Sequence, residues 1–360
     1  MTHKIDRYIV WRLLNITLFV LLVLIFVFIV IDFSENSDDF TDKGATISEI
    51  FGQYYFNYIP EMIRLVIPVA VFVACLYLTG QMADRLEIVA LKAAGVSLYR
   101  LIVPYMVFAF FSAGVISYLD GFVIPEANSK RIAFEKKYIR NQNENLDRNR
   151  IFRQDRLNRI YKFSYYNPRD TSAIRVEAYY FEGDSISETL SIRRMSWRPF
   201  ERDWGMYNVT RRNFTANGIQ EEEIDTIYMN LNIYPADLAR TTSDIYQLTY
   251  PEAQDYIESI HRSGATGISL PQIQFYGRLA YPLSIIVVSV IGFAVASVRR
   301  PGGKGFYITA GLVISFLYLV LMKVIEPFGK AGEIEPFVAA LIPHLFFMIV
   351  GVALLIGARK

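Results

Sequence analysis

The segment Arg85-Leu-Glu-Ile-Val-Ala-Leu-Lys-Ala-Ala-Gly-Val-Ser97 is a charged, amphipathic stretch between two long apolar runs. Apolar residues recur in it at helical spacing and share one face of a predicted helix: Leu86, Val89, Ala90 and Ala93. Three charged residues lie elsewhere on it: Arg85, Glu87 and Lys92. Gly95 is placed to end the helix. Such a helix either docks on a soluble partner or lies on the membrane surface as a connector, and amphipathicity alone leaves both interpretations open.

The flanking apolar runs belong to a pattern that covers the whole chain. The 360 residues are 53% hydrophobic and 15% aromatic, with a formal net charge of only +2. An apolar helix of about 20 residues crosses a bilayer core. Six runs approach or exceed that length, at 9–31, 59–81, 101–123, 275–298, 306–324 and 336–357. The sequence therefore predicts an α-helical polytopic membrane protein with six transmembrane helices, and it lacks the basic footprint of a nucleic-acid-binding protein.

Charges near the ends of the runs predict the orientation of the chain, because basic residues are retained on the cytoplasmic side. With both termini in the cytoplasm, the inner segments hold the basic residues Lys4, Arg7, Arg12, Arg85, Lys92, Arg100, Arg299, Arg300, Lys304, Arg359 and Lys360. The first and last outer loops are acidic. The first run is too long for a signal peptide and lacks a cleavage site, so we expect an uncleaved span.

The polar insert between the third and fourth runs has about 150 residues, the length of one domain. Its β-branched and aromatic stretches predict strands at 159–165, 174–181, 189–194, 206–214 and 227–233. Turn residues separate these stretches at roughly ten-residue intervals, which is typical of an antiparallel sandwich or jelly roll. The preceding segment 141–155 predicts an exposed lead-in, and 251–263 a short amphipathic exit helix.

These observations predict three parts of the chain. Residues 1–125 form a first transmembrane half with three spans and the amphipathic helix at 82–96. Residues 126–265 form an inserted all-β, jelly-roll-like domain on the outside, with its lead-in and exit helix. Residues 266–360 form a second transmembrane half with three spans.

Five local motifs occur in this plan and carry a resemblance to a known family. They are Asp6-Arg-Tyr-Ile9, Glu87-x-x-x-Leu91-Lys-Ala-x-Gly95-x-Ser97, Val123-Ile-Pro125-x-x-Asn128, Ile233-x-Pro235-x-Asp-Leu238, and Tyr276-x-Arg278 through Pro282. Together with the order of spans and β-domain, they resemble the LptF/LptG (YjgP/YjgQ) permeases of the bacterial inner membrane. The resemblance covers nearly the whole chain, and the start at Asp6 leans slightly toward LptG.

The resemblance implies the transmembrane permease of an ATP-binding cassette exporter that extracts lipopolysaccharide from the inner membrane. It implies a second LptF/LptG-type permease, a cytoplasmic ATPase dimer and periplasmic jelly-roll bridge proteins of the LptC/LptA type as partners. It also implies that the β-domain is periplasmic and that the amphipathic helix couples to the ATPase. The ATPase-coupling residues are then Arg85, Glu87, Leu91, Lys92 and Gly95.

The sequence itself contains no phosphate-binding loop, since Gly302-Gly-Lys-Gly305 lacks the required spacing and the terminal hydroxyl. We therefore expect no cofactor on this chain, with ATP and magnesium bound by the partner ATPase. The three histidines are scattered and Cys75 lies in an apolar run, so neither a metal site nor a catalytic residue is expected. The chain is expected not to be an enzyme.

Ionisable residues within the spans are candidates for the lipid path, because a charge in hydrocarbon is costly. The lipid-path candidates among them are Asp32, Arg64, Arg278 and Lys323, and Asp120 and His344 are further ionisable residues of the spans. Arg64 and Lys323 either meet lipid phosphates or snorkel to the interface. His344 is expected to make a structural hydrogen bond to a neighbouring helix rather than transfer protons. Inside the β-domain, the candidates that face acyl chains are Ile160, Phe163, Val176, Ala178 and Tyr228.

Asp32, followed by Glu35, departs from the resemblance, because LptG-like relatives can carry a basic residue at the outer end of the first span. An acidic mouth would repel phosphates. Either divalent cations bridge the lipid, or the partner permease supplies basic residues, or the lipid carries fewer phosphates. A second reading of the whole chain also stays open, in which it is a non-transporting scaffold or signal-transmitting subunit coupled to an ATPase.

Overall fold

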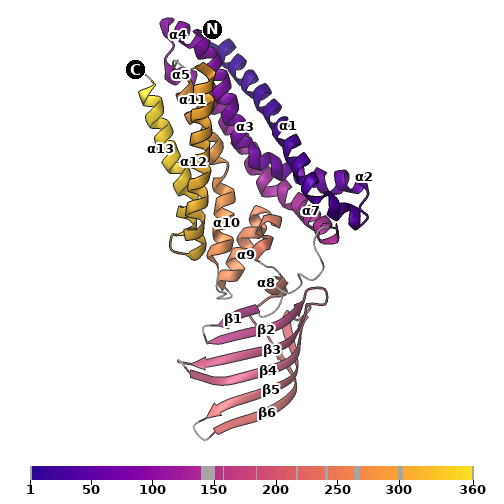
Figure 1. Ribbon diagram of the computed structural model, residues 1–360. Helices are drawn as coiled ribbons and strands as arrows, with labels where there is room; N and C mark the ends of the chain where they lie inside the picture. Colours follow the sequence, from indigo (N-terminus) through magenta and orange to yellow (C-terminus); the bar gives the residue numbers. More distant parts are fainter. Residues whose placement is uncertain are drawn as a thin grey trace. The chain divides into compact units, whose positions relative to one another are not determined.

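The structure is a computed structural model that describes residues 2–138, 151–156, 158–183, 185–215, 218–239, 242–262, 268–298 and 303–358. Contacts divide the chain into two compact units (Figure 1). The helical unit contains residues 1–139, 246–250 and 272–360, and the β unit contains residues 140–245 and 251–271. Each unit is described by itself.

The helical unit is built from the apolar runs. Its first half contains α1 (Thr2–Asp42), α2 (Ile47–Glu49), the π-helical turn η1 (Ile50–Tyr55), α3 (Phe56–Asp84), α4 (Glu87–Ala93), α5 (Leu98–Leu101), α6 (Val103–Tyr118), the π-helical turn η2 (Leu119–Val123) and α7 (Ile124–Tyr138). Its second half contains α10 (Ser269–Ala280), α11 (Leu283–Ala296), α12 (Gly303–Ala331) and α13 (Pro336–Gly357). The core lies along α3, where Ala70, Val71, Ala74 and Cys75 are fully buried.

The described residues contain four helices that are long and apolar enough to cross a membrane, or five if α10 and α11 form one bent span. The sequence predicted six. The expected span at 275–298 is broken, because α10 and α11 meet at an angle of 47° at Tyr281–Pro282. The expected span at 306–324 lies in α12, several of whose side chains fall outside the described residues to which this count is restricted.

One end of the helical unit gathers the start of α1, the end of α13 and the short helix α4 (Figure 1). Hydrogen bonds join this end, since Arg12 donates to Gln81 at 2.9 Å and the Arg100 guanidinium pairs with Asp6. Two of the basic residues predicted on the inner side, Arg12 and Arg100, therefore make these contacts. Those at 299, 300, 359 and 360 lie outside the described residues.

The β unit is a single antiparallel sheet whose strands pair in chain order. The strands are β1 (Ile151–Arg156), β2 (Arg159–Asn167), β3 (Ser172–Glu182), β4 (Ser185–Arg198), β5 (Asp203–Thr215) and β6 (Gly218–Met229). The insert is all-β as predicted, but a jelly roll would have two sheets linked by Greek-key connections. Short turns join consecutive strands here, so neighbours in sequence become neighbours in the sheet.

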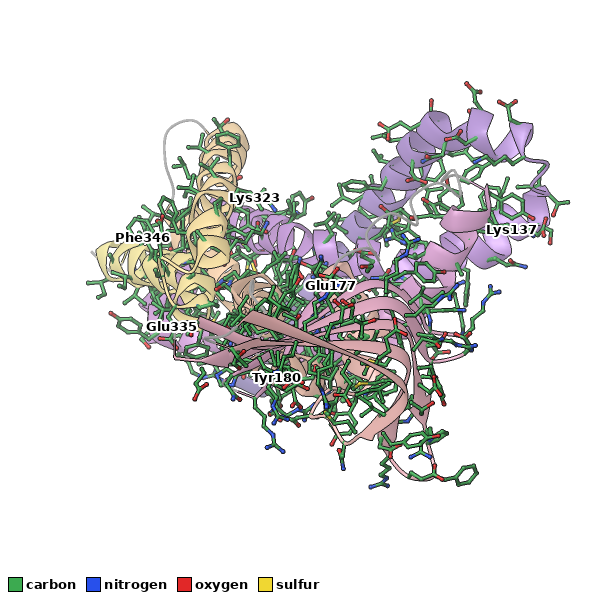
Figure 2. The ribbon with its side chains drawn as sticks, turned by 90° about the horizontal axis from the view of Figure 1, so that it is seen from below. Lys137, Glu177, Tyr180, Lys323, Glu335 and Phe346 are labelled. Atoms are coloured by element: carbon green, nitrogen blue, oxygen red, sulfur yellow. The ribbon has the colours of Figure 1, made fainter. Side chains whose placement is uncertain are left out.

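Side chains alternate between the two faces of this sheet. On β3, Tyr180 shares a hydrogen bond with the buried Tyr161 at 3.2 Å, whereas Glu177 accepts one from Lys162 at 2.9 Å on the other face (Figure 2 labels Tyr180 and Glu177). The core face is covered in part by the segment after β6, which supplies Leu231, Ile233 and Leu238. That segment continues into α8 (Pro235–Ala239), the 3-10 helix η4 (Thr242–Gln247) and α9 (Tyr250–Arg262).

The structure differs from the predicted start of the insert in two ways. The lead-in at 141–155 ends in strand β1, which pairs with β2 through Ile151 and Phe163; residues 141–150 lie outside the described part of the chain. Helix α7 belongs to the helical unit although the insert was expected to begin at residue 126. Its Phe134 and Tyr138 pack in an aromatic cluster with Phe40 and Tyr54, which holds α7 against the end of α1 and against η1.

Candidate functional site

Two of the predicted lipid-path residues, Arg64 and Arg278, converge on Asp120 inside the helical unit. The Nε atom of Arg278 lies 3.5 Å from Oδ1 of Asp120, and the Nε atom of Arg64 lies 3.7 Å from the same oxygen. Arg278 also donates to the backbone carbonyls of Asp120 and Leu248, the latter at 2.9 Å. These contacts tie α3, η2, α10 and the segment 246–250 together.

The site depends on an irregular stretch of backbone that follows α6. Asp120 and Gly121 lie in the π-helical turn η2, and such turns change which carbonyls are bonded within the helix. Tyr250 packs directly on Gly121, where a Cβ atom would lie 2.7 Å from the ring. Its hydroxyl donates to Asp120 at 3.5 Å. Burial, with a further effect of the Asp120 carboxylate, raises the pKa of Tyr250 to about 12, so this donor stays protonated.

A line of ion pairs continues from Arg64 and links α3 to α7. Arg64 lies 3.9 Å from Glu61, Arg131 lies 3.2 Å from Glu61, and Arg131 lies 3.5 Å from Glu135. With Asp120 and Arg278, the line contains three arginines and three carboxylates, so its charges balance. The chemistry is that of a structural network, because each of these six charges is paired.

Sequence reasoning selected Arg64, Asp120 and Arg278 but missed Glu61, Arg131 and Glu135 in the same network. A local signal existed, because Glu61 and Arg64 are three positions apart and Arg131 and Glu135 are four positions apart, the spacings at which side chains meet on a helix. The role of Tyr250 had no such signal, since its partner lies 130 positions away.

Asp32 is engaged by two hydroxyl groups, and Glu35 beside it is exposed. The side chain is half-buried, and Tyr54 and Tyr55 donate to its two oxygens at 3.4 and 3.0 Å. The tyrosines come from η1, which packs against α1. The two hydroxyl donors hold the carboxylate in place but leave it its negative charge, so the repulsion of phosphates stays a prediction.

The remaining ionisable candidates differ in exposure. The Lys323 side chain is 81% exposed on α12 (Figure 2) and lies 3.0 Å from Glu326, which also pairs with Lys330 at 2.7 Å. His344 is buried on α13 and its Nδ1 shares a hydrogen bond with the Tyr318 hydroxyl on α12. This helix-to-helix bond agrees with the structural interpretation of His344.

The predicted coupling residues lie on and beside α4, which is shorter than the expected helix at 82–96. Helix α3 runs on to Asp84, and Leu86 then adopts a left-handed backbone with φ of 63° that starts α4 in a new direction. Gly95, with φ of +84°, ends it, and Val96 donates to the Leu91 carbonyl at 3.0 Å. Glu87 lies 3.9 Å from Arg85, and Lys92 is exposed.

Helix α4 rests on the core through a face other than the one predicted to be apolar. Ile88 is buried and Leu91 packs beside it in the main core of the helical unit. Four apolar residues instead stay exposed on the other side: Leu86, Val89, Ala90 and Ala93. The helix therefore has an uncovered apolar face beside two exposed charges, Arg85 and Lys92.

The five β-domain candidates divide between the two faces of the sheet. Phe163, Val176 and Ala178 are fully buried in the core, where Phe163 pairs with Val176 across β2 and β3. Ile160 lies on the opposite face from Phe163, because the two are three positions apart and successive side chains of a strand alternate between faces. Tyr228 is exposed beneath the Arg198 guanidinium, 3.9 Å from its ring centroid. The expectation that Ile160 and Tyr228 face inward is wrong.

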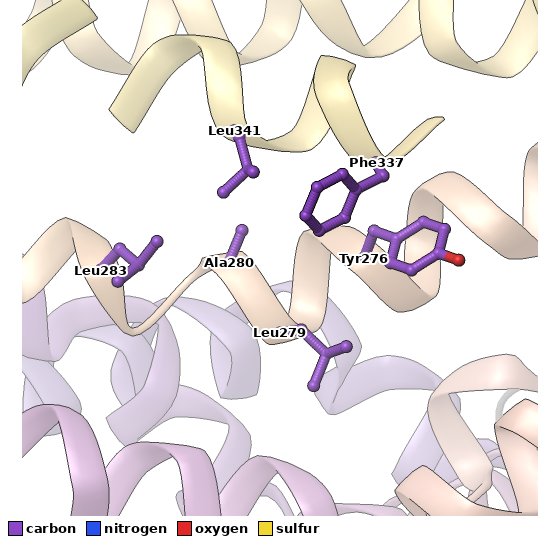
Figure 3. Close-up of a pocket in the computed structure, with 6 residues that line it drawn as sticks. All are labelled: Tyr276, Leu279, Ala280, Leu283, Phe337 and Leu341. Carbon is purple, nitrogen blue, oxygen red and sulfur yellow. The ribbon is translucent and has the colours of Figure 1, made fainter. Parts of the chain in front are cut away.

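A small apolar cavity lies where the break between α10 and α11 faces α13 (Figure 3). Its volume is about 140 Å³, and it is lined by Tyr276, Leu279, Ala280, Leu283, Phe337 and Leu341. With only one hydroxyl in its lining, the cavity suits hydrocarbon and not a charged headgroup.

Several residues of the quoted motifs have structural tasks. Asp6 pairs with Arg100, which joins α1 to α5. The Asp237 carboxylate accepts from the backbone nitrogen of Tyr234 at 2.9 Å, and its carbonyl accepts from Arg153 at 2.8 Å, which joins the segment after β6 to β1. Arg278 bonds to Asp120 of η2. Residues of the motifs thus make contacts that join one structural element to another.

Comparisons with known proteins agree with this architecture. The profile of the family described as "Lipopolysaccharide export system permease LptF/LptG" matches residues 7–357. The chain is 19% identical over 306 residues, 84% of each chain, to the lipopolysaccharide export system permease protein LptG of Escherichia coli K12. It is 21% identical over 356 residues, 97% of each chain, to the protein of the same name from Haemophilus influenzae. The chain therefore belongs to the LptF/LptG family of lipopolysaccharide export system permeases.

Proposed function

We propose that this chain is the transmembrane permease subunit of an ATP-binding cassette exporter. In this function it extracts lipopolysaccharide from the bacterial inner membrane and passes it to a periplasmic β-jelly-roll bridge that leads toward the outer membrane. ATP and magnesium are bound by a separate cytoplasmic ATPase dimer, and the chain itself carries no cofactor. A second LptF/LptG-type permease completes the lipid cavity.

The observation that carries the proposal is the uncovered apolar face of α4 at the end of the helical unit where α1 starts and α13 ends (Figure 1). An amphipathic helix that leaves apolar residues in water is suited to a groove on a soluble partner. The opposite face of α4, through Ile88 and Leu91, is joined to the core. Movement of a docked ATPase would therefore be transmitted to α3 and α1.

The proposed orientation places both termini and α4 in the cytoplasm and the β unit in the periplasm. It follows from the basic residues at the α4 end, which include Arg12, Arg85, Lys92 and Arg100. In the proposed cycle, ATP binding closes the ATPase dimer, the coupling helices follow, and the cavity between the two permeases narrows. The lipid then moves up to the β unit.

The candidate residues of the proposed lipid path differ in how strongly other groups of the protein already engage their side chains. Lys323 projects from α12 and is the candidate for contact with a lipid phosphate, since its ion pair with Glu326 is exposed and weak. Arg64 and Arg278 are engaged by Asp120 and act on the shape of the path rather than on the lipid. In the β unit, Phe163, Val176 and Ala178 form the apolar surface that acyl chains would meet once the core face opens.

The alternative function is a non-transporting scaffold or signal-transmitting subunit, which requires no lipid path. An experiment at two adjacent residues of β6 distinguishes the two functions. Ile227 pairs with Met206 on the core face and is partly buried, whereas Tyr228 pairs with Gly205 and lies on the opposite face. A photo-crosslinking amino acid at each position, in cells with the complete transporter, samples the two faces of one strand.

We expect a lipopolysaccharide adduct at Ile227 that depends on a working ATPase, and none at Tyr228. An ATPase-deficient partner should abolish the adduct while both variants reach normal expression. Adducts of equal yield at both positions, or none at Ile227 with an active ATPase, would contradict the proposed path and favour the scaffold.

A further inference from the structure

We propose that the β unit contains a binding site for a sugar ring that carries a negatively charged substituent. The site is a cavity of about 500 Å³ at one end of the sheet, lined by Trp197, Pro199, Arg202, Asn230 and Tyr234. Its volume falls within the range of about 300–1,000 Å³ that is usual for small-molecule sites. It lies apart from the buried acyl-chain candidates and was not expected from the sequence.

Three segments of the chain meet at this cavity. Trp197 is near the end of β4, Pro199 and Arg202 belong to the turn between β4 and β5, and Asn230 and Tyr234 follow β6. The turn is fastened by a double hydrogen bond from Arg198 to Asp203, at 2.8 and 2.5 Å. The lining residues therefore sit on a fixed frame, which lowers the entropic cost of binding.

Aromatic rings form one wall of the cavity. Trp197 packs edge-to-face with Trp204 at 5.4 Å and with Tyr234 at 5.9 Å between ring centroids. Trp204 is fully buried, and its indole nitrogen donates to the Ile233 carbonyl at 2.7 Å. The C–H face of a sugar ring packs well on such partly exposed aromatic rings, which combine an apolar body with a polar edge.

The polar groups of the cavity complement a charged sugar. Among the described residues, the Arg202 guanidinium forms no ion pair, in contrast to Arg198, which pairs with Asp203, and Arg262, which lies 3.4 Å from Asp237. Arg202 is thus available for a phosphate or carboxylate, which arginine binds through two hydrogen bonds. The Asn230 amide can both donate to and accept from sugar hydroxyls.

The lining disfavours an acyl chain as the ligand. Such a chain would displace water from the exposed Arg202 and Asn230 groups and offer them no hydrogen bond in return, which is unfavourable. The identity of the natural ligand, the saccharide part of lipopolysaccharide, rests on the proposed function, whereas the presence of the site does not.

The test is a tryptophan-fluorescence titration of the purified full chain without its partners. A Trp11→Phe background leaves Trp197 and the fully buried Trp204 as emitters, since the sequence has three tryptophans. Glucose 6-phosphate and glucuronate serve as charged sugars, and glucose and inorganic phosphate as controls. Arg202→Gln removes the charge from the site. Arg175→Gln is the matched control, because Arg175 and Arg202 are both exposed and both have a φ of 55°.

We expect both charged sugars to bind in the background protein and in Arg175→Gln. Their affinity should be at least about tenfold lower in Arg202→Gln, because glutamine can keep one of the two hydrogen bonds but not the charge. Glucose should bind weakly and inorganic phosphate should not compete. Phosphate binding equal to that of glucose 6-phosphate would overturn the sugar assignment. Absence of any titration, or equal loss in Arg175→Gln, would overturn the site. Neither result depends on the lipid adduct at Ile227, which tests the proposed function separately.

Discussion

Arg278 and Asp120 lie 158 positions apart in the chain and pair inside the helical unit, with 3.5 Å between Nε and Oδ1 and both side chains 1% exposed. The pair joins the first and second halves of the helical unit at a π-helical turn. Because Arg278 also holds two backbone carbonyls, a rotation of α10 would have to break several bonds at once. The pair therefore fixes one arrangement of these elements.

Removal of the Asp120 carboxylate tests how much the pair with Arg278 contributes to stability. Asp120→Asn leaves Arg278 buried without its counter-charge, so we expect the free energy of unfolding to fall by about 3–5 kcal/mol. Arg278→Gln should cost a similar amount, and the double variant less than the sum of the two. Denaturant titration of the purified protein in detergent measures the three values. Strict additivity would show that the two side chains do not act as a pair.

The helical part and the inserted β-domain could be predicted from the sequence, because each depends on the local pattern of apolar and polar residues. Long apolar runs predict membrane helices, and β-branched stretches between turns predict strands, whatever their partners are. The pattern does not show a break such as that between α10 and α11, where Pro282 follows an apolar helix that continues in a new direction. This break accounts for the expected span at 275–298, whereas the expected span at 306–324 lies in α12, whose side chains are only partly described.

The candidate site was only partly readable, because it depends on contacts between distant segments. Arg64 and Arg278 stand out as charges in apolar runs, but their shared partner Asp120 is defined by the fold. Tyr228 illustrates the second difficulty, since a shift of one residue in strand register moves a side chain to the other face. Asp32 illustrates the third, because the hydroxyls that surround it come from a separate element, η1.

Charge placed on the exposed face of α4 should uncouple the ATPase without unfolding the permease. Val89 is 55% exposed, so Val89→Asp is expected to change stability by no more than about 0.5 kcal/mol. It places a charge where the proposed groove is apolar, and co-purification of the ATPase should fall at least about tenfold. Glu87→Lys, on the same helix, should also weaken association.

The control for Val89→Asp is Val89→Ile, which keeps the apolar contact and should retain the ATPase. Pull-down of the ATPase on tagged permease, with thermal unfolding of each variant, gives both readings. Normal co-purification of Val89→Asp, in a permease that still unfolds as the unmodified protein does, would remove α4 as the docking helix.

A methyl group at Gly121 should weaken the contact between η2 and Tyr250. The added Cβ of Gly121→Ala would lie 2.7 Å from two ring carbons of Tyr250, so the ring must move away from Asp120. We expect a loss of about 1–3 kcal/mol in the free energy of unfolding, the usual cost of overpacking.

Gly114→Ala is the matched control, because a Cβ there meets no atom within 4 Å. That variant should be neutral or gain up to about 1 kcal/mol, since alanine favours a helix over glycine. Truncation of the ring in Gly121→Ala/Tyr250→Ala should remove most of the added cost of the alanine. If Gly121→Ala and Gly114→Ala unfold alike, the close approach of Tyr250 to η2 does not constrain the folded protein.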